Sequence, residues 1–369
     1  YGDKRRTKIT ASMDDMDDED LIEEKQVAVT LTHLGYLKRI PADTYKTQKR
    51  GGKGITGLTT RENDFVTDLI MTSTHDNLMF FTNTGKAHKI KAYEIPEATR
   101  TAKGTPAINF LNLMQRERIT TVIPFRDFRN DKYLMAVTKK GTIKKTAMSS
   151  FDTNRKTGLI AINLKDGDEL VEIKQTTGSD NVIIITKQGK CICFSENDVR
   201  PMGRIAGGVR AIKLEDDDEV VSMQLVQPGE ELMVVTSKGY GKRTPVEDYK
   251  VQTRGGKGLL TYDKSKFSKT GMLVGALVVD DDDEVLLINS EGTIIRIKAA
   301  EVSKLGRATQ GVRIMRADDD VNIISIAKVI REEEHEMDAK LALEKKARKK
   351  AEAEKEEAEE ESEQTKMKI

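Results

Sequence analysis

Residues 181–194 read NVIIITKQGKCICF, which is an apolar run, a polar turn that ends in glycine, and a second run. β-Branched residues favour strands, and a turn that closes on glycine is typical of a β-hairpin. Thr186 stands three residues before Gly189, a pairing that favours a type I turn with its glycine in the left-handed region. The stretch therefore predicts a bulged hairpin, and its recurrence along the chain decides the fold.

The hairpin pattern occurs six times, with turn glycines spaced by 50, 56, 48, 50 and 53 residues. A second glycine follows the first by 19 residues in five repeats and by 17 in the third. The hairpins are residues 27–40, 77–90, 132–146, 181–194, 231–244 and 284–297. The turn glycines are Gly35, Gly85, Gly141, Gly189, Gly239 and Gly292, and the second glycines are Gly54, Gly104, Gly158, Gly208, Gly258 and Gly311.

After the second glycine, each repeat continues with a short apolar stretch, a polar turn and a last strand. In the fourth repeat these are Ile212 with Leu214, then residues 216–218, then residues 220–225. One unit of about four short strands cannot bury its own faces, whereas six arranged radially can. We therefore predict an all-β fold, a six-bladed propeller-like disc with four-stranded blades. An open β array is the alternative.

The net charge of +1 over 369 residues hides a strong segregation. Residues 1–26 carry net −4 and read as a flexible acidic linker, and residues 331–369 also carry net −4 and predict a solvated helix or a disordered tail. Residues 27–330 carry net +9 and form the predicted β domain. The chain starts at Tyr1 without an apolar leader, so we expect a fragment with no visible targeting signal and no bilayer-crossing run.

Positive charge lies at one phase of the repeat, between the two glycines of each unit. These six windows hold 27 basic and 9 acidic residues, whereas the rest of residues 27–330 holds 20 basic and 29 acidic. In a radial fold one phase means one rim or face, so we expect a basic rim on an otherwise acidic disc. Such a rim suits a long polyanion. The windows are residues 36–53, 86–103, 142–157, 190–207, 240–257 and 293–310.

Duplex DNA, held by its phosphates, is the polyanion that the composition favours. Single-strand binding uses aromatic stacking platforms, but the chain has no Trp and only 5% aromatic residues. It has no helix-turn-helix, zinc-finger or RNP-type pattern, so base readout is not expected. Any sequence preference would come from the bendability of the DNA.

Other functions lack a signature in the sequence. There is no Gly-x-x-x-x-Gly-Lys-Ser/Thr phosphate loop, and the four histidines have no metal-ligand spacing. Acidic residues 216–219 and 280–284 favour hairpin turns over calcium loops, which need alternating oxygens. Cys191 and Cys193 lie on one face of a predicted strand, which fits a reducing, cytosolic setting better than a disulfide. We therefore predict no catalytic constellation and no metal site in this chain.

Residues 48–54 read QKRGGKG and are the strongest candidate for a phosphate contact. Its glycines let the backbone approach a surface that a Cβ would block, while Lys and Arg hold phosphate. The residues of this box are Gln48, Lys49, Arg50, Gly51, Gly52, Lys53 and Gly54. The predicted rim contacts are Lys38, Arg39, Lys86, Lys89, Lys91, Arg100, Lys103, Lys144, Lys145, Arg155, Lys156, Lys190, Arg204, Lys242, Arg243, Arg254, Lys257, Arg296, Lys298 and Arg307.

The box, set in a basic window of a six-fold β array, resembles the C-terminal domains of DNA gyrase A subunits. The signature of that family is Gln, Lys/Arg, Arg, Gly, Gly, Lys/Arg, Gly, and residues 48–54 match it at every position. The resemblance covers the whole chain. Residues 1–26 would be the end of the breakage-reunion core and its linker, residues 27–330 the wrapping domain, and residues 331–369 the variable tail.

This resemblance implies a six-bladed β-pinwheel whose neighbouring blades exchange a strand and whose basic rim wraps duplex DNA with positive sense. The holoenzyme, an ATP-dependent type IIA topoisomerase, would thereby introduce negative supercoils. The implied partners are double-stranded DNA and the gyrase B subunit, together with a second A subunit in a heterotetramer. The resemblance implies no membrane and places the protein in the bacterial cytoplasm at the nucleoid. This chain would be no enzyme by itself and would need no cofactor, because the ATP, Mg²⁺ and cleavage sites belong to other regions.

Alternative functions remain open at this stage. Topoisomerase IV resembles these blades but lacks an intact box, and a propeller-like scaffold could turn its basic windows to an acidic protein. A propeller hydrolase would need convergent carboxylates or a nucleophile, which no phase of the repeat supplies. Residues 252–258 (QTRGGKG) nearly repeat the box, with Thr253 in place of a cation, and are either a second contact or a remnant of blade duplication.

The box yields a first prediction. Replacing Lys49, Arg50 and Lys53 together by alanine is expected to abolish DNA wrapping, because the phosphate-binding cations are lost, while thermal unfolding changes little. The linking number of circles closed around the protein measures wrapping, and calorimetry measures unfolding. Collapse of the fold in this variant would show that the box is structural.

Overall fold

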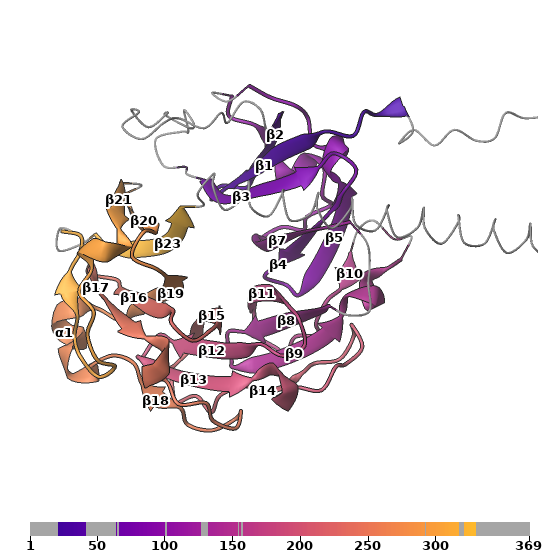
Figure 1. The fold of residues 1–369 in the computed structure, drawn as a ribbon. Coiled ribbons are helices and arrows are strands. Elements are labelled where there is room, and N and C mark those ends of the chain that lie inside the picture. Colours follow the sequence, from indigo (N-terminus) through magenta and orange to yellow (C-terminus); the bar gives the residue numbers. More distant parts are fainter. Residues whose placement is uncertain are drawn as a thin grey trace, which may run out of the picture.

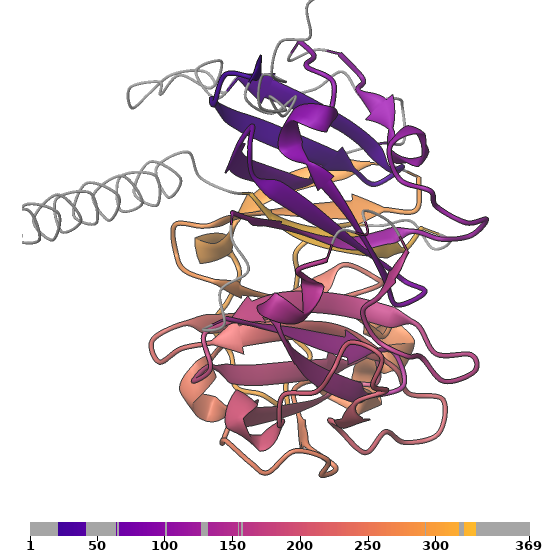
Figure 2. The same ribbon diagram turned by 90° about the vertical axis from the view of Figure 1, so that its right-hand side faces the viewer.

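The computed structural model of this chain describes residues 21–41, 64, 66–99, 102–126, 132–153, 155, 158–291, 293–316 and 321–329. Six antiparallel sheets, called blades one to six in chain order, follow one another along an arc that brings blade six opposite blade one (Figure 1). Figure 2 shows the arc from the side, with the strands of the nearest blades running roughly along its axis. The predicted all-β, six-bladed fold is confirmed.

Each blade is built from an inner strand, a central hairpin and, in blades one to five, a short outer strand. From the inside outward, blades one to three are β3 (Val66–Ser73), β1 (Gln26–Thr32), β2 (Tyr36–Pro41), β6 (Thr105–Pro106); β7 (Ile119–Phe125), β4 (Asn77–Thr82), β5 (Lys86–Lys91), β10 (Leu159–Ile160); and β11 (Leu170–Thr176), β8 (Tyr133–Thr138), β9 (Thr142–Ala147), β14 (Val209–Arg210). Blades four to six are β15 (Val220–Val226), β12 (Asn181–Thr186), β13 (Lys190–Ser195), β18 (Leu259–Leu260); β19 (Leu273–Val279), β16 (Glu231–Thr236), β17 (Tyr240–Pro245), β22 (Val312–Arg313); and β23 (Ile323–Val329), β20 (Glu284–Asn289), β21 (Ile294–Lys298).

The outer strand of each blade comes from the following repeat. In blade three, for example, β9 pairs with β14, and β14 follows the hairpin of blade four in the chain. The strand exchange implied by the family resemblance is therefore confirmed. Sequence periodicity alone placed this strand in its own repeat, because the period of a repeat does not show which neighbour its strand pairs with. Blade six has three strands among the described residues.

Helical structure in the described residues is confined to short segments. Single 3-10 turns follow the hairpins of blades two to six: η3 (Ala92–Glu94), η5 (Met148–Phe151), η6 (Glu196–Asp198), η7 (Val246–Asp248) and η9 (Ala299–Glu301). The others are η4 (Ala107–Asn109), η8 (Lys264–Lys266) and the four-residue helix α1 (Phe267–Thr270).

The hairpin turns have the geometry that the sequence predicts. In blade four, the amide of Gly189 donates to the Thr186 carbonyl (3.0 Å), and the Thr186 hydroxyl accepts from the amide of Lys190 (3.1 Å). Gly189 has φ +77°, and the turn glycines of blades one, two, three and five lie between +76° and +79°. Glycine takes this left-handed conformation without the steric cost of a Cβ.

In repeats two, four, five and six, the second glycine allows the outer strand to approach the hairpin. A Cβ on Gly208 would lie 2.6 Å from the Ile143 carbonyl oxygen, and a Cβ on Gly104 equally close to that of Leu37. Both glycines also have positive φ, +83° and +84°. The phase of these glycines therefore reflects strand exchange, in addition to any part in ligand binding.

The acidic turns cap the hairpins. Asp64, Asp168 and Asp218 each accept, at 2.9 Å, the amide of the residue just before a turn glycine. Residues 216–219 are thus part of a turn, as predicted, and the carboxylate of Asp218 satisfies a backbone donor that the hairpin leaves unpaired.

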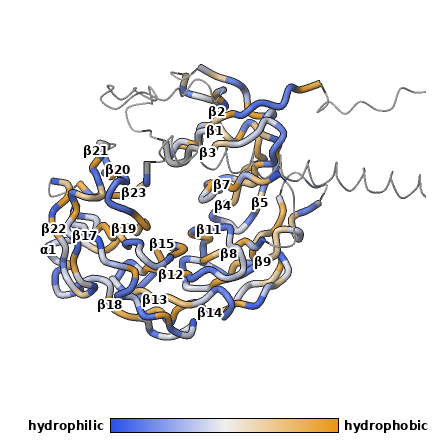
Figure 3. The backbone as a smooth tube through the Cα atoms, in the orientation of Figure 1, coloured by the Kyte–Doolittle hydropathy of each residue, from blue (hydrophilic) through white to orange (hydrophobic). Residues whose placement is uncertain are grey.

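The core lies between adjacent blades. Val137 and Ile143 of blade three share one buried cluster with Ile184 and Ile192 of blade four. Figure 3 shows apolar stretches recurring in the blades next to hydrophilic turns. Complete burial of one such side chain contributes about 1.5–3 kcal/mol to the stability of the fold. Because the neighbouring blade provides this burial, the strands of one blade depend on the next blade for their stability.

Strand exchange generates the second prediction. Gly208→Ala should destabilise the fold by at least about 2 kcal/mol, because its backbone has positive φ and the new Cβ would meet the Ile143 carbonyl. Gly203→Ala, in the same loop, is the matched control, since Gly203 has free space around it. Urea unfolding measures both variants, and equal stabilities would contradict the close approach.

Candidate nucleic-acid interface

The outer strands and the loops that lead into them form the outer edge of the arc, here called the rim (Figure 1). The described rim loops are residues 95–99 and 102–104 before β6, residues 153, 155 and 158 before β10, residues 199–208 before β14, residues 250–258 before β18 and residues 302–311 before β22. These loops belong to the basic windows of the sequence, so the expected rim exists as a structural feature.

The rim residues predicted from the sequence divide into three groups by exposure. The box (Gln48 to Gly54), Arg100 and Lys156 lie outside the described residues. The exposed side chains are Lys103, Arg155, Lys257, Arg296 and Lys298. The half-buried ones are Arg39, Lys86, Lys89, Lys91, Lys190, Arg204, Arg254 and Arg307.

The third group is buried, and for it the prediction of a surface phosphate contact is wrong. Lys38, Lys144, Lys145, Lys242 and Arg243 are at most 3% exposed. They lie on the second strand of a hairpin, where the outer strand and its loop cover them. The sequence shows the charge of these residues but not the strand that passes over them.

The buried lysines hold the rim loops. The Lys144 ammonium group donates to the carbonyls of Ala161 (2.7 Å) and Arg204. The ammonium group of Lys242 donates to those of Gly306 (2.6 Å) and Arg307. In blade one, Lys38 donates to the Ala102 carbonyl (3.0 Å).

Burial lowers the pKa of Lys144 to about 8, and it does the same to Lys242. Desolvation is the main cause in both, and a neighbouring arginine, Arg204 or Arg307, adds repulsion. The fold therefore keeps these cations in place through hydrogen bonds to loop carbonyls.

The next position along the same strands also links neighbouring repeats. The Lys145 ammonium group pairs with the buried carboxylate of Glu196 at 2.8 Å, and this carboxylate also accepts from the Thr176 hydroxyl at 2.7 Å. Arg243 donates to the Val302 carbonyl (2.8 Å) and pairs with Glu231 (2.8 Å). Both cations are therefore structural.

Several half-buried cations are partly engaged within the fold. Lys89 donates to the Thr153 carbonyl (2.6 Å), Lys91 to that of His75 (3.0 Å), and Arg39 to that of Ile95 (3.0 Å). The remaining partners are Met114 for Lys86, Glu215 for Lys190 and, on the exposed side, Glu284 for Arg296. These side chains would have to exchange a protein partner for a phosphate.

The near-copy of the box, residues 252–258, is a rim loop of defined geometry. The amide of Gly255 donates to the Ala211 carbonyl (2.6 Å), and the Lys213 amide donates to the Gly256 carbonyl (2.8 Å). The Arg254 guanidinium donates to the carbonyls of Asp198 (2.8 Å) and Arg210 (3.0 Å). The glycines and Arg254 thus join the loop to the neighbouring outer strand, and Lys257 is exposed for a ligand.

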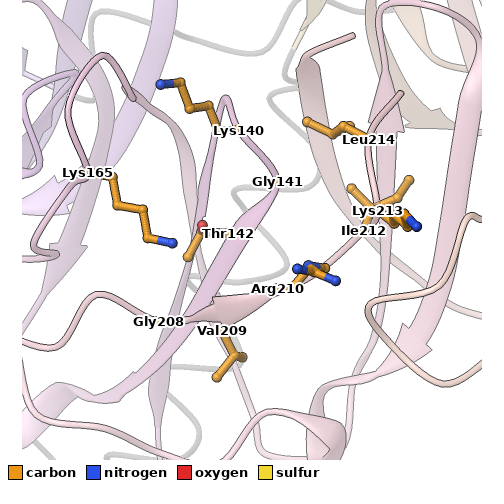
Figure 4. Close-up of a pocket in the computed structure, with 10 residues that line it drawn as sticks. All are labelled: Lys140, Gly141, Thr142, Lys165, Gly208, Val209, Arg210, Ile212, Lys213 and Leu214. Atoms are coloured by element: carbon orange, nitrogen blue, oxygen red, sulfur yellow. The ribbon is translucent and has the colours of Figure 1, made fainter. Parts of the chain in front are cut away.

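A basic groove beside β14 was not predicted from the sequence. Lys140, Lys165, Arg210 and Lys213 line a space of about 660 Å³, together with Gly208 and Val209 (Figure 4). All four cations are exposed, and Lys140 also donates to the Asp166 carbonyl (2.7 Å). Residues 208–214 follow the fourth window, where the repeat pattern predicts only a short apolar stretch.

A recurring arginine is a second signal that the sequence prediction did not use. Arg204, Arg254 and Arg307 each lie four residues before the second glycine of their repeat, and Arg50 and Arg100 have the same place in the sequence. The outer strands β14 and β22 also share an exposed arginine, Arg210 and Arg313. In the described part of the chain, Arg204, Arg210, Arg254, Arg307 and Arg313 supply guanidinium groups, which bind phosphate oxygens well, at the outer edge of successive blades.

Chemistry other than anion binding has little support in the described residues. Within them, no cluster of His, Cys, Asp and Glu could hold a metal ion, and no helix has the length and apolar character needed to cross a membrane. Cys191 and Cys193 are buried free thiols, and burial raises their pKa to about 12 and about 11. They behave as packing residues.

The geometry defines a class: a six-bladed, strand-exchanging β-propeller with a cationic outer rim. A family model described as "DNA gyrase C-terminal domain, beta-propeller" matches six successive segments, residues 27–73, 76–126, 132–177, 180–227, 230–280 and 283–330. The chain therefore belongs to the family of DNA gyrase C-terminal domains.

Named relatives agree with this assignment. The chain is 54% identical over 338 residues to the DNA gyrase A subunit of Clostridium acetobutylicum, and 44% identical over 338 residues to that of Mycolicibacterium smegmatis. These alignments cover 92% and 90% of this chain, but 40% of each relative, so the chain spans about two fifths of the curated relatives it matches.

Two solved structures share the fold. A DNA gyrase A C-terminal domain superposes with a TM-score of 0.66 at 31% identity, covering 83% of this chain and all (100%) of the other. The C-terminal domain of a DNA topoisomerase IV superposes with a TM-score of 0.73 at 26% identity, covering 84% and 94%.

The buried lysines generate the third prediction. In Lys144→Met, the loop before β14 should exchange its amide hydrogens faster, because its carbonyls lose their donor. The pH dependence of stability should change too. Folded Lys144 releases its proton near pH 8 and the unfolded residue near 10.5, so the unfolded state binds more protons between these values. The unfolding free energy of the parent should thus rise with pH relative to the variant.

Denaturant titrations at several pH values between about 8 and 10.5 measure this difference. Lys132→Met, at an exposed lysine, is the control and should run parallel to the parent. Parallel curves for Lys144→Met as well would contradict a buried lysine that loses its proton easily.

Proposed function

We propose that this chain binds duplex DNA along its rim and wraps it with positive sense, as the wrapping domain of a gyrase A subunit. The observation that carries the proposal is the row of exposed cations on successive outer strands and loops, within a fold whose family is that of gyrase C-terminal domains. Arg155, Arg210, Lys257 and Arg313 lie on different blades, so one long polyanion would touch them in turn.

The physical argument favours DNA bent around the rim. Phosphate contacts carry no base information, and the described rim offers no stacking platform of aromatic side chains. Bending a 20–30 bp site by 40–90° costs on the order of 1–6 kcal/mol, and contacts from several blades offset that cost. Bending followed by wrapping is therefore the activity that a basic rim supports.

In the whole protein, we place this domain in an ATP-dependent type IIA topoisomerase that introduces negative supercoils. Two A subunits and two gyrase B subunits would form the holoenzyme, acting on chromosomal DNA in the bacterial cytoplasm. We assign no cofactor to this chain, and ATP and Mg²⁺ would act at regions outside it. The identity with gyrase A subunits supports this placement.

A second candidate is the C-terminal domain of topoisomerase IV, which the superposition with such a domain supports. The intact box at residues 48–54 favours gyrase. A third possibility is a scaffold that binds an acidic protein through the same rim. Such a scaffold would not change the linking number of DNA, whereas a wrapping domain would.

The proposal predicts a change in linking number. Nicked circles that are ligated around the purified chain should gain positive writhe after removal of the protein, because wrapped DNA is trapped in that state. The variant Arg155→Ala, Arg210→Ala, Lys257→Ala should wrap less, and the slope of log affinity against log salt should fall by roughly 0.9 per lost phosphate contact.

Lys132→Ala is the matched control, since this exposed lysine precedes β8, two strands inside the rim. It should leave both quantities unchanged. Parent protein that binds circles without any shift in linking number would refute wrapping.

A further inference from the structure

Because the sheets share one strand order, their hairpin turns, and the turns that cap them, lie at the same end of each blade. This end of the blades is here called the turn face. In blades three and four these capping turns are acidic: residues 165–169 carry net −2 and residues 215–219 net −5. Their structural duty is to supply an acceptor for a hairpin amide, as Asp168 does for Lys140. Their charge would repel a polyanion.

Blade five reverses this charge. Residues 263–271 replace the acidic turn with η8 and α1 and carry net +2. The capping acceptor is now a backbone carbonyl, because the Lys238 amide donates to Thr270 (3.1 Å). Since a neutral acceptor satisfies the hairpin, the added lysines are not required by the fold.

These lysines are available to a ligand. Lys238, Lys266 and Lys269 are exposed, and among the described residues they enter no ion pair, whereas Lys264 pairs with Glu215 (2.7 Å). The Lys238 ammonium group makes one long hydrogen bond, to the Ser268 carbonyl (3.5 Å), which a phosphate would replace. Asp263 is the only carboxylate within this short segment, and it accepts from the Ser265 amide (3.0 Å) and hydroxyl (2.7 Å).

The lysines continue the rim onto the turn face. Tyr240 of β17 is the link: the Lys269 ammonium group lies 5.8 Å from its ring centre, and the Arg313 guanidinium, on the outer strand β22, 5.3 Å. Arg313 also donates to the Tyr240 hydroxyl (2.9 Å). Figure 1 places α1 beside β17 at the outer side of blade five.

We propose that Lys238, Lys266 and Lys269, together with Arg313, form a second phosphate-binding surface that draws the duplex from the rim toward the turn face at blade five. This inference rests on the proposed DNA binding. An acidic protein partner is less suited, because Phe267, the large apolar side chain of the segment, stacks on Tyr262 (5.7 Å between ring centres) and is half-buried. Protein interfaces are anchored by aromatic residues of this kind.

The consequence is a pitch in the DNA path. A duplex that stayed in the plane of the rim would make a flat bend, whereas contacts displaced along the disc axis make it rise as it curves. Curvature with a rise is a superhelix, and a superhelix has writhe of one hand. Blade five would thus help to set the amount of writhe per bound protein.

The test compares Lys238→Ala, Lys266→Ala, Lys269→Ala with the parent chain. The salt slope for a 100–150 bp duplex should fall by roughly 0.9 per lost contact, about 2.7 for three. The linking-number shift should shrink, and hydroxyl-radical footprints should lose protection at one end of the protected region. The matching triple arginine variant should restore all three readouts, because it keeps the charge.

Each outcome decides the matter. If the parent wraps DNA and the alanine variant keeps the parent slope and footprint, the second surface is refuted while the proposed function stands. Loss of binding to a polyglutamate peptide, with DNA binding intact, would identify an acidic protein as the ligand instead. If the parent itself fails to bind and wrap DNA, the proposed function fails first. Unchanged thermal unfolding in the alanine variant confirms that these exposed lysines do not support the fold.

Discussion

The exchanged outer strand depends on cations buried beneath it. Lys38, Lys144 and Lys242 lie at the same hairpin position in blades one, three and five, and each donates to at least one carbonyl of the loop that leads into the covering strand. A buried ammonium group without such partners would cost several kcal/mol, so the loop must close in one geometry. That loop geometry determines the positions of the arginines on the rim. The arrangement of the rim therefore depends on buried hydrogen bonds that make no contact with a ligand.

Much of the fold followed from periodicity, and the reasons are local. Thr186 and Gly189 specify their hairpin whatever surrounds them, and six copies specify a radial β array. Strand exchange had to come from the family resemblance, since β14 pairs with β9 across a whole repeat. The interval between the glycines is basic for two reasons that composition cannot separate. Some of its cations are structural, such as Lys144, which faces inward toward carbonyls, and others lie on the surface, such as Lys257, which faces solvent.

At the groove beside β14 the sequence prediction missed exposed cations, whereas at Lys144 it predicted exposure for a buried one. Arg210 and Lys213 follow the second glycine, where the repeat pattern is defined by its apolar residues. Among the other repeats only the last has cations at these two positions, Arg313 and Arg316, so the periodic signal is weak. A two-residue strand alternates its side chains, so Val209 and Arg210 point to opposite sides and only the arginine faces outward. Surface charge in this fold is therefore set by alternation along very short strands, and counting charges over a window averages it out.

Strand exchange also governs how such a chain can change length. Removal of the last repeat would take β22 from blade five and leave an exposed edge on a sheet that no longer ends the array. Excision of an internal segment between equivalent positions, by contrast, would let each remaining hairpin receive its outer strand from the new neighbour. The number of blades can thus be altered in evolution by in-register duplication or loss within the array, whereas trimming from its end is opposed by the sheet that would be left unfinished.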